Sequence, residues 1–276
     1  KKMIDTNLIK NNSQIVIENL KSRNYDLDYE LYERLESDRK KYQTETENLQ
    51  AQRKTLSHEF GMLKKEGKDD PELNKKIESV NNALEICSSK LNEVQQALKE
   101  FLLDIPNLSD KSVPIGLNEA NNVKIREHGE PKILKGKDHL DITSMIDTES
   151  ANLLAGSRFA VLKAEIAKLQ RALIAFMLDK ASEHGYVEYY LPMVANTSSL
   201  TSTGQLPKFS DDLFQLSDDY YLIPTAEVPL TNLFRNQILE IDKLPFKLTA
   251  HTSCFRSEAG SYGKDTKGLI RQHQFE

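Results

Sequence analysis

The sequence predicts an α+β protein in which a long antiparallel coiled-coil hairpin precedes a mixed domain built on an antiparallel sheet. Residues from about 28 to 104 hold almost no glycine or proline outside one short segment, which is typical of long helices. After residue 122, one long helix is followed by several strand-like segments, a pattern typical of α+β domains. With 276 residues, the chain is long enough for about two domains.

The hairpin is predicted by a heptad pattern on both sides of the segment Gly67 to Pro71. Glycine is expected to end the first helix, and Asp70-Pro71 to begin the second with proline at its first position. On the second side, apolar residues recur in alternating steps of four and three: Leu73, Ile77, Val80, Leu84, Cys87, Leu91, Val94, Leu98, Phe101 and Ile105. On the first side the seam is weaker, with Leu35, Tyr42, Leu49, Leu56 and Leu63 seven residues apart. Two helices with one narrow apolar stripe each should pair and project into solvent.

Two interpretations of this hairpin are open on the residues alone. It could be a spacer or a dimerisation coil, or it could be an arm roughly 50 Å long that reaches a large partner. Arg53-Lys54 and Lys64-Lys65 are possible phosphate contacts, although single charges on a coiled coil are more often solvated.

Composition limits the class of protein. Charged residues make up 29% of the chain and the formal net charge is −5, which argues against a generic basic nucleic-acid binder but allows a local RNA-binding patch. No run of about 18 apolar residues occurs, so we expect no membrane span. Cys87 and Cys254 form neither a disulfide framework nor a metal-binding spacing, and the expected location is a reducing cytoplasm.

The predicted domains are residues 1–110, a linker over 111–122 that is rich in turn formers, and residues 123–276. In the last of these we expect a short strand over Val123 to Glu127 and an amphipathic helix over Ser157 to Glu183 that ends at His184-Gly185. A strand containing Pro192 should follow, at a sheet edge or an interface. Further strands are expected at Tyr221 to Ile223, Lys247 to His251 and Leu269 to Phe275.

The last 22 residues hold the strongest candidates for chemistry. In predicted neighbouring strands, Arg256 and Glu258 share one face, and so do Arg271 and Phe275. Guanidinium groups bind phosphate or carboxylate oxygens in a bidentate manner, and a ring beside them can stack on a purine. A surface salt-bridge ladder explains the same residues equally well on composition alone.

Four stretches and the hairpin resemble one family. FRSEAGSYGKDTKGLIRQHQFE is similar to motif 2 of the class II aminoacyl-tRNA synthetases, in the form found in seryl-tRNA synthetases. TGQLPKF, LIPTAEVPLTN and the segment around Pro192, which resembles motif 1, point to the same family, and the hairpin resembles its tRNA-binding arm. The resemblance covers the chain from end to end. It implies a class II catalytic domain behind the arm.

The resemblance also implies roles for the motif 2 residues. Arg256 is the expected catalytic residue, holding the ATP α-phosphate and the serine carboxylate. Glu258 would contact the adenine amino group, with Ser257 in the same ATP site. Phe275 would stack on adenine, and Arg271 would lie on its other side or on the γ-phosphate.

The remaining implied contacts involve serine and tRNA. Thr225, Ala226 and Glu227 would line the L-serine pocket, with Glu227 near the ammonium group. Lys264 and Lys267, in the loop from Gly260 to Gly268, would meet the acceptor end of tRNA(Ser). The implied reaction is ATP-dependent serine–tRNA ligation assisted by Mg²⁺.

The same resemblance sets expectations about assembly and completeness. A homodimer is expected through the Pro192 region. Motif 3, with its arginine and acidic metal ligands, does not occur in the 276 residues, so we expect no metal ligands in this chain. We also expect the chain to be a piece, truncated after motif 2, of a longer active enzyme, and the piece to be inactive by itself.

Three alternatives are weighed against the ligase. A ligase that loads an amino acid onto a carrier protein has no need of the long arm. A non-catalytic tRNA-binding paralogue is disfavoured by the intact motif residues. A Cys254–His251 nucleophile pair is disfavoured because a three-residue spacing on a strand places the two side chains on opposite faces.

Overall fold

The computed structural model describes residues 4–67, 69–116, 118–130, 136–258 and 268–276. The chain divides into two compact units, one ending at Glu127 and the other covering His128–Glu276. The predicted domain limits at residues 110 and 122 stay predictions. No described helix is both long and apolar enough to cross a membrane.

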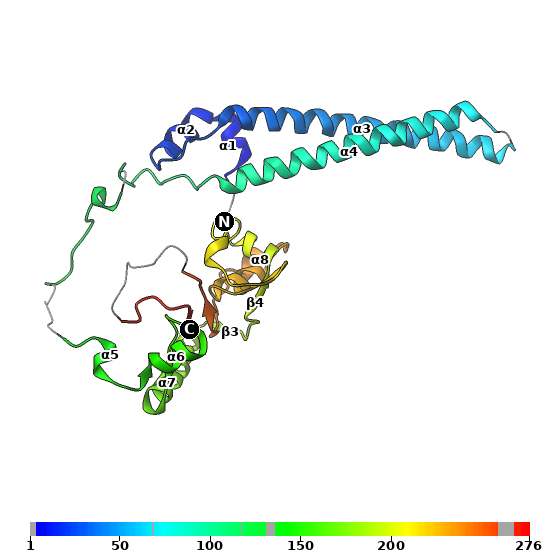
Figure 1. Ribbon diagram of the computed structural model, residues 1–276. Helices are drawn as coiled ribbons and strands as arrows, with labels where there is room; N and C mark the ends of the chain where they lie inside the picture. Colours follow the sequence, from blue (N-terminus) through cyan, green and yellow to red (C-terminus); the bar gives the residue numbers. More distant parts are fainter. Residues whose placement is uncertain (1–3, 68, 117, 131–135, 259–267) are drawn as a thin grey trace. The chain divides into compact units, whose positions relative to one another are not determined.

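The first unit is helical, as Figure 1 shows. Its helices are α1 (Thr6–Asn11), α2 (Ser13–Lys21), α3 (Tyr29–Lys65) and α4 (Pro71–Asp104), and a short 3-10 turn covers Glu119–Asn121. The helices α3 and α4 lie side by side along their length and form the predicted hairpin, hereafter the arm.

The turn of the arm follows the chemistry expected of its residues. Gly67 has φ +70°, a left-handed conformation that glycine adopts at little cost. The Asp70 carboxylate accepts hydrogen bonds from the backbone N–H groups of Glu72 and Leu73, at 2.9 and 3.1 Å. Pro71 is the first residue of α4 and needs no donor there. The predicted helix boundaries are therefore confirmed.

The seam of the arm is apolar with one polar interruption. Every predicted seam residue of α4 is buried or half-buried. From α3, Thr46 is buried at this seam, and its hydroxyl donates a hydrogen bond to the Cys87 sulfur at 3.3 Å. This contact shows which residues of the two antiparallel helices face each other.

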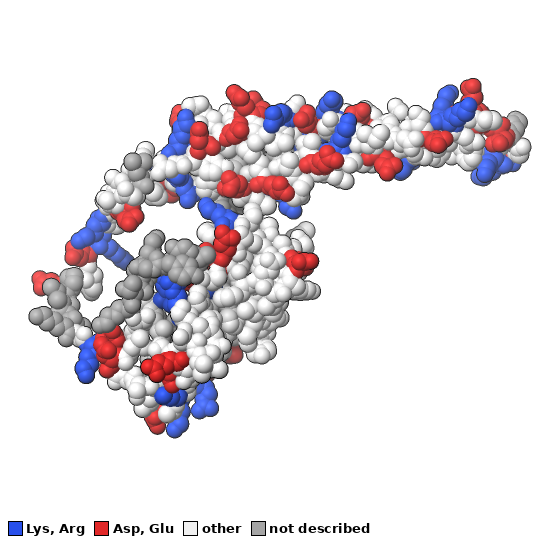
Figure 2. Space-filling view, in the orientation of Figure 1, with Lys and Arg blue, Asp and Glu red and all other residues white. Residues whose placement is uncertain are grey.

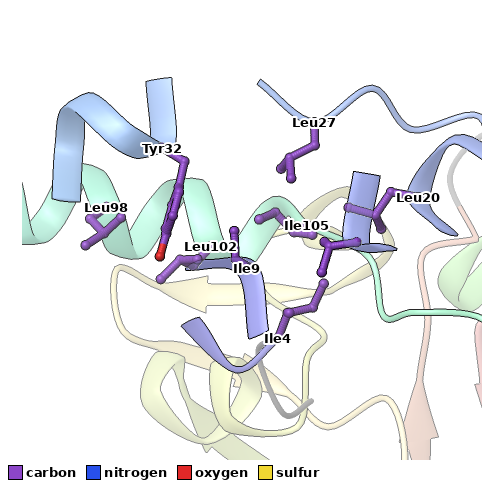
Figure 3. Packing of buried hydrophobic residues seen from close by; sticks show 9 residues of the cluster. Ile4, Ile9, Leu20, Leu27, Tyr32, Leu98, Leu102 and Ile105 are labelled. Carbon is purple, nitrogen blue, oxygen red and sulfur yellow. The ribbon is translucent and has the colours of Figure 1, made fainter. Parts of the chain in front are cut away.

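A cluster of buried residues packs the base of the arm against α1 and α2 (Figure 3). Its members come from both ends of the unit: Ile4, Ile9, Val16, Leu20, Leu27, Tyr32, Leu98, Leu102 and Ile105. Ile9, Val16 and Leu20 are fully buried. The tip of the arm lacks such support, so the base is the stable core of this unit.

The segment after the arm is tied to α2 at its start. The Asn19 side chain exchanges two hydrogen bonds with the Ser109 backbone, donating to its carbonyl at 3.0 Å and accepting from its N–H at 2.8 Å. The strand predicted over Val123 to Glu127 is wrong, because those residues are irregular. Val123 and Ile125 are exposed, and residues without a strand partner cannot form a ladder.

The second unit is a mixed α+β structure, as predicted. Its helices are α5 (His139–Ile142), α6 (Thr148–Ala155), α7 (Ala164–Glu183), α8 (Thr197–Ser202) and α9 (Glu227–Asn232), with 3-10 turns at Ser210–Asp212 and Ile241–Lys243. Its strands are β1 (Ile146–Asp147), β2 (Val161–Leu162), β3 (Val187–Glu188), β4 (Val194–Asn196), β5 (Gln215–Ser217), β6 (Tyr220–Leu222), β7 (Leu248–Thr249), β8 (Cys254–Phe255) and β9 (Gln274–Phe275).

These strands form small sheets. Antiparallel pairs join β1 to β2, β4 to β6, β5 to β6 and β8 to β9, and a parallel pair joins β3 to β7. A core of seven buried residues fills the part around β4, β6, α8 and α9: Ala195, Leu200, Leu206, Leu213, Tyr221, Ile223 and Val228.

Several predicted elements of this unit differ in extent. The strands predicted over Lys247 to His251 and Leu269 to Phe275 are limited to β7 and β9, two residues each. The helix predicted from Ser157 begins only at Ala164, because the preceding residues pair as β2 with β1 and Arg158 has φ +64°. The strand around Pro192 is interrupted, with β3 before the proline and β4 after it, as expected where a ladder donor is lost. The predicted end of α7 is confirmed, since His184 is its C-cap residue and Gly185 has φ +80°.

Candidate functional site

The hairpin of β8 and β9 places Arg256 next to Phe275. Cys254 pairs with Phe275 and Phe255 with Gln274, and the Arg256 N–H donates to the His273 carbonyl at 2.9 Å. The Arg256 Nε donates to the Pro224 carbonyl at 3.2 Å, and its guanidinium lies over the Phe275 ring at 5.0 Å. Arg256 thus covers one face of the ring.

Glu258 and Arg271 meet on the side of this hairpin where the chain connects β8 to β9. Arg271 Nη1 lies 3.5 Å from Glu258 Oε2, with both side chains partly exposed. Both residues lie outside the assigned strands, and Glu258 has φ +51°. The prediction that Arg256 and Glu258 lie on one face of a strand is therefore wrong, because the backbone leaves the extended conformation at Glu258. The ion pair does bring Arg271 and Glu258 together, but an exposed pair contributes little to stability.

Ser257 is held by the segment before β5. Its N–H donates to the Asp212 carbonyl at 3.0 Å, and its hydroxyl donates to the Asp211 carbonyl. These bonds attach the segment after β8, which carries Arg256, to the 3-10 turn Ser210–Asp212.

The residues Thr225 to Glu227 lie at the start of α9, beside this hairpin. The Phe255 N–H donates to the Ile223 carbonyl at 2.8 Å, which links the two segments. The Thr225 hydroxyl accepts from the Glu227 N–H at 3.4 Å. Thr225 and Ala226 are half-buried, and Glu227 is exposed.

A cavity of about 990 Å³ lies between α7 and the β8–β9 hairpin. Its lining includes the apolar side chains of Ile166, Leu173 and Met177 of α7, together with Thr225 and Phe275. The structure therefore brings three of the predicted site residues, Thr225, Ala226 and Phe275, to one cavity. Lys264 and Lys267 lie outside the described residues.

His273 supports the backbone of Arg256. Its ring Nδ1 lies 2.8 Å from the Arg256 carbonyl oxygen. The ring also contacts two phenylalanines, with centroids 5.3 Å from Phe159 and 6.0 Å from Phe214. These contacts show how the His273 side chain packs.

Cys254 and His251 do not form a nucleophile pair. Burial raises the pKa of the Cys254 thiol, which donates to the Thr252 carbonyl at 3.6 Å. His251 Nε2 lies 2.6 Å from a Glu276 carboxylate oxygen instead. A thiol with a raised pKa is a poor nucleophile.

His139 is a residue of this site that the sequence did not single out. Its Nε2 accepts a hydrogen bond from the Leu269 N–H at 2.8 Å. Gly268 has φ +80°, and a Cβ built on it would lie 2.6 Å from the His139 ring. His139 therefore packs against the backbone that leads into β9. No spacing pattern could reveal a contact between segments 130 residues apart.

Within the described residues, no group of three or more His, Cys, Asp and Glu side chains is placed to hold a metal ion.

Comparison with known proteins identifies this arrangement. The family model described as the tRNA synthetase class II core domain (G, H, P, S and T) matches residues 208–276. The fold and the site accordingly define a class II aminoacyl-tRNA synthetase. The model described as the seryl-tRNA synthetase N-terminal domain matches residues 3–109.

Relatives along the whole chain make the assignment specific. The chain is 49% identical over 284 residues to a serine–tRNA ligase of Francisella philomiragia and 44% identical over 290 residues to one of Cupriavidus taiwanensis. Each alignment covers 99% of this chain and 67% of the relative. The chain belongs to the seryl-tRNA synthetase family.

Solved structures agree with this assignment. A crystal structure of seryl-tRNA synthetase from Pyrococcus horikoshii complexed with ATP matches with a TM-score of 0.79 and 30% identity, over 99% of this chain and 68% of that one. A cytoplasmic serine–tRNA ligase from Naegleria fowleri in complex with AMP matches with a TM-score of 0.74 and 24% identity, over 99% and 65%, which supports the fold alone.

Proposed function

We propose that this chain supplies the tRNA-binding arm and the ATP- and serine-binding motifs of a serine–tRNA ligase. The observation that carries the proposal is the convergence of Arg256, Phe275 and Thr225 beside one cavity, in a chain that also holds the arm. The reaction uses ATP to form seryl-adenylate and then transfers the seryl group to tRNA(Ser).

The ATP site is proposed around Arg256. Its guanidinium would bind the α-phosphate and the serine carboxylate, because a fork of N–H donors matches both. Adenine would stack on the ring face of Phe275 that Arg256 leaves open, with Glu258 and Ser257 nearby. Arg271, which pairs with Glu258 at 3.5 Å, would hold the outer phosphates once it exchanges that partner for the nucleotide.

The serine site is proposed at Thr225, Ala226 and Glu227. Thr225 and Ala226 line the cavity, and the exposed Glu227 carboxylate can accept from an ammonium group. A site that hydrogen-bonds the serine hydroxyl rejects alanine, since its polar groups would be left unpaired.

The chemistry needs no protein nucleophile. A serine carboxylate oxygen attacks the α-phosphorus, the bond to the β-phosphate oxygen breaks, and pyrophosphate leaves. The terminal ribose hydroxyl of tRNA then attacks the acyl carbon and AMP leaves. Arg256 would contribute by positioning both reactants and neutralising charge on the α-phosphate.

Mg²⁺ is proposed to enter with ATP, since Mg²⁺ in nucleotide enzymes relies on substrate phosphates with few protein carboxylates. Among the described residues, no group of three or more His, Cys, Asp and Glu side chains is placed to hold the ion. We place the reaction in the cytoplasm, where tRNA and ATP are used together.

The tRNA contacts are proposed along the arm and at Lys264 and Lys267, near the acceptor end. Positive and negative side chains alternate along the arm in Figure 2, so binding would depend on particular residues. Arg39 is engaged within the arm, where its Nε and Nη2 each lie 2.8 Å from a Glu36 carboxylate oxygen. Arg53 and Lys54 are exposed and better placed for phosphate.

A homodimer through the Pro192 region is also proposed. The residues around it are apolar yet exposed: Tyr190 at 92%, Met193 at 42% and Val194 at 38%. Tyr190→Glu should convert the dimer to a monomer in sedimentation velocity. An unchanged sedimentation coefficient would rule out this interface.

The proposed function is tested by serine-dependent ATP–pyrophosphate exchange in the protein that contains this chain. Arg256→Ala should lower the exchange rate by at least about 100-fold, the usual loss on removing a donor to a charged transition state. Arg171→Ala removes an exposed arginine from α7 and serves as the matched control. Exchange that does not require serine, or that survives Arg256→Ala, would contradict the proposal.

A further inference from the structure

We propose that His273 is a positioning residue for Arg256: it fixes the backbone of Arg256 so that the guanidinium meets the α-phosphate. This inference rests on the proposed function and assigns a task to a residue outside the contacts predicted for ATP, serine and tRNA.

One residue binds both polar backbone groups of Arg256. The Arg256 N–H donates to the His273 carbonyl at 2.9 Å, and the Arg256 carbonyl accepts from His273 Nδ1 at 2.8 Å. The first bond belongs to the β8–β9 ladder, which any side chain at position 273 could keep. The second requires a donor at the Nδ1 position. A carbonyl can only accept, so Nδ1 carries a proton in this contact.

Two aromatic rings pack against the imidazole, and a further hydrogen bond holds the backbone N–H of His273. Its ring lies against Phe159 at an interplanar angle of 44° and meets Phe214 edge-on at 85°. The His273 N–H donates to the Arg158 carbonyl at 2.9 Å, which joins β9 to the segment before β2. Side chains locked by such packing hold a reacting group within the narrow tolerance that a site requires.

Arg256 is the first residue after β8, so its backbone depends on the His273 side chain for support. Regular β8 pairing ends at Phe255, and by Glu258 the backbone has reached φ +51°. Arg256 stands where the ladder stops. The His273 side chain replaces the next ladder bond and keeps the carbonyl of Arg256 in place. Without it, the Arg256 backbone can shift, and a displacement of about 1 Å can reduce the rate by about 100-fold.

The test separates the donor from the ring. His273→Asn retains an N–H donor at the Nδ1 position but removes the ring, whereas His273→Phe retains the ring contacts but removes the donor. In ATP–pyrophosphate exchange on the full-length protein, we expect His273→Phe to lower kcat about tenfold, the effect of one neutral hydrogen bond. The KM for serine should change less than twofold, and His273→Asn should keep kcat within about threefold of the wild type.

A double-mutant cycle shows whether His273 acts through Arg256. In an Arg256→Lys background, the added His273→Phe change should lower kcat less than twofold, because the group it positions is already altered. If thermal melting shows that His273→Phe is unfolded, His273→Gln replaces it. The Gln amide lies one carbon farther from the backbone than that of Asn and misses the Arg256 carbonyl.

Each remaining outcome overturns the proposal. If His273→Phe has the wild-type kcat, the hydrogen-bond donor at Nδ1 is not needed. Equal losses in the Asn and Phe variants assign the effect to packing alone. Fully additive losses with Arg256→Lys mean that His273 acts independently. Failure of the proposed function is distinct, since the wild-type protein would then show no serine-dependent exchange at all.

Discussion

Shortening the arm by one heptad on each helix should uncouple tRNA charging from serine activation. Thr46 faces Cys87 across the antiparallel seam, so residues 50–56 lie opposite residues 77–83. Deleting both segments removes seven residues from each helix and leaves the remaining seam in phase. At 1.5 Å per residue the tip moves back by about 10 Å.

The magnitude follows from the charges that the deletion affects. Arg53 and Lys54 are exposed and disappear, while Lys64 and Lys65 move by about 10 Å, roughly one Debye length at 0.1 M salt. Each neutralised phosphate contributes a factor of about 5 to affinity near 0.15 M salt relative to 1 M. Loss of two contacts should therefore raise the KM for tRNA(Ser) by about 25-fold.

The assay compares two reactions of the same full-length protein. Serylation of tRNA(Ser) should fall, while ATP–pyrophosphate exchange should stay within about twofold, because its proposed residues lie in the other unit. Arg53→Gln with Lys54→Gln is the length-preserving control and should reproduce the loss of affinity alone. Unchanged serylation by the shortened protein would refute the reasoning, and equal loss of both reactions would show that the deletion damages the fold.

Three further predictions concern individual side chains. Thr46→Val should stabilise the arm by about 1 kcal/mol in urea unfolding, since a buried methyl replaces a hydroxyl that donates to the weak sulfur acceptor of Cys87. Thr55→Val, at an exposed position of α3, should change little, and destabilisation by Thr46→Val would contradict this account. Gly268→Ala should displace the His139 ring and weaken ATP binding a few-fold. In a His139→Ala background the same change should weaken ATP binding less. Equal effects in both backgrounds would show that the change does not act through the His139 ring. Hydrogen bonds from the Ser150 backbone N–H and from Lys163 lower the pKa of Asp147 to about 2. The stabilisation by the Asp147 carboxylate is therefore present above pH 3.8 and lost as pH falls toward 2. Asp147→Asn should lower the melting temperature at pH 7, and a melting-temperature difference from the wild type that does not shrink at pH 3 would contradict the linkage.

The arm was predictable because its signals are local. Heptad spacing, Gly67 and the Asp70-Pro71 start act within a few residues of one another, and the structure confirms each of them. The polar contact between Thr46 and Cys87 was not predicted, since it depends on how two helices align.

The site was predictable in its residues more than in its geometry. The motif resemblance selected Arg256, Phe275 and Thr225, which the structure brings together, but alternation along a strand failed at Glu258. Strand length depends on partners that local sequence does not specify. Long-range contacts such as His139 with Leu269 carry no periodic signal, and for that reason the sequence could not reveal them.

The core at the base of the arm has a consequence for folding. Tyr32 stacks with Phe101 at 6.3 Å and packs near Leu98, although the chain between them runs to the far tip and back. Closing a disordered loop of about 65 residues would cost about 4 kcal/mol in chain entropy. A hairpin that begins at the Gly67 turn and zips toward its base replaces this long closure by a series of local steps. The arm should therefore form before the core that anchors it, because its contacts are closed by local steps.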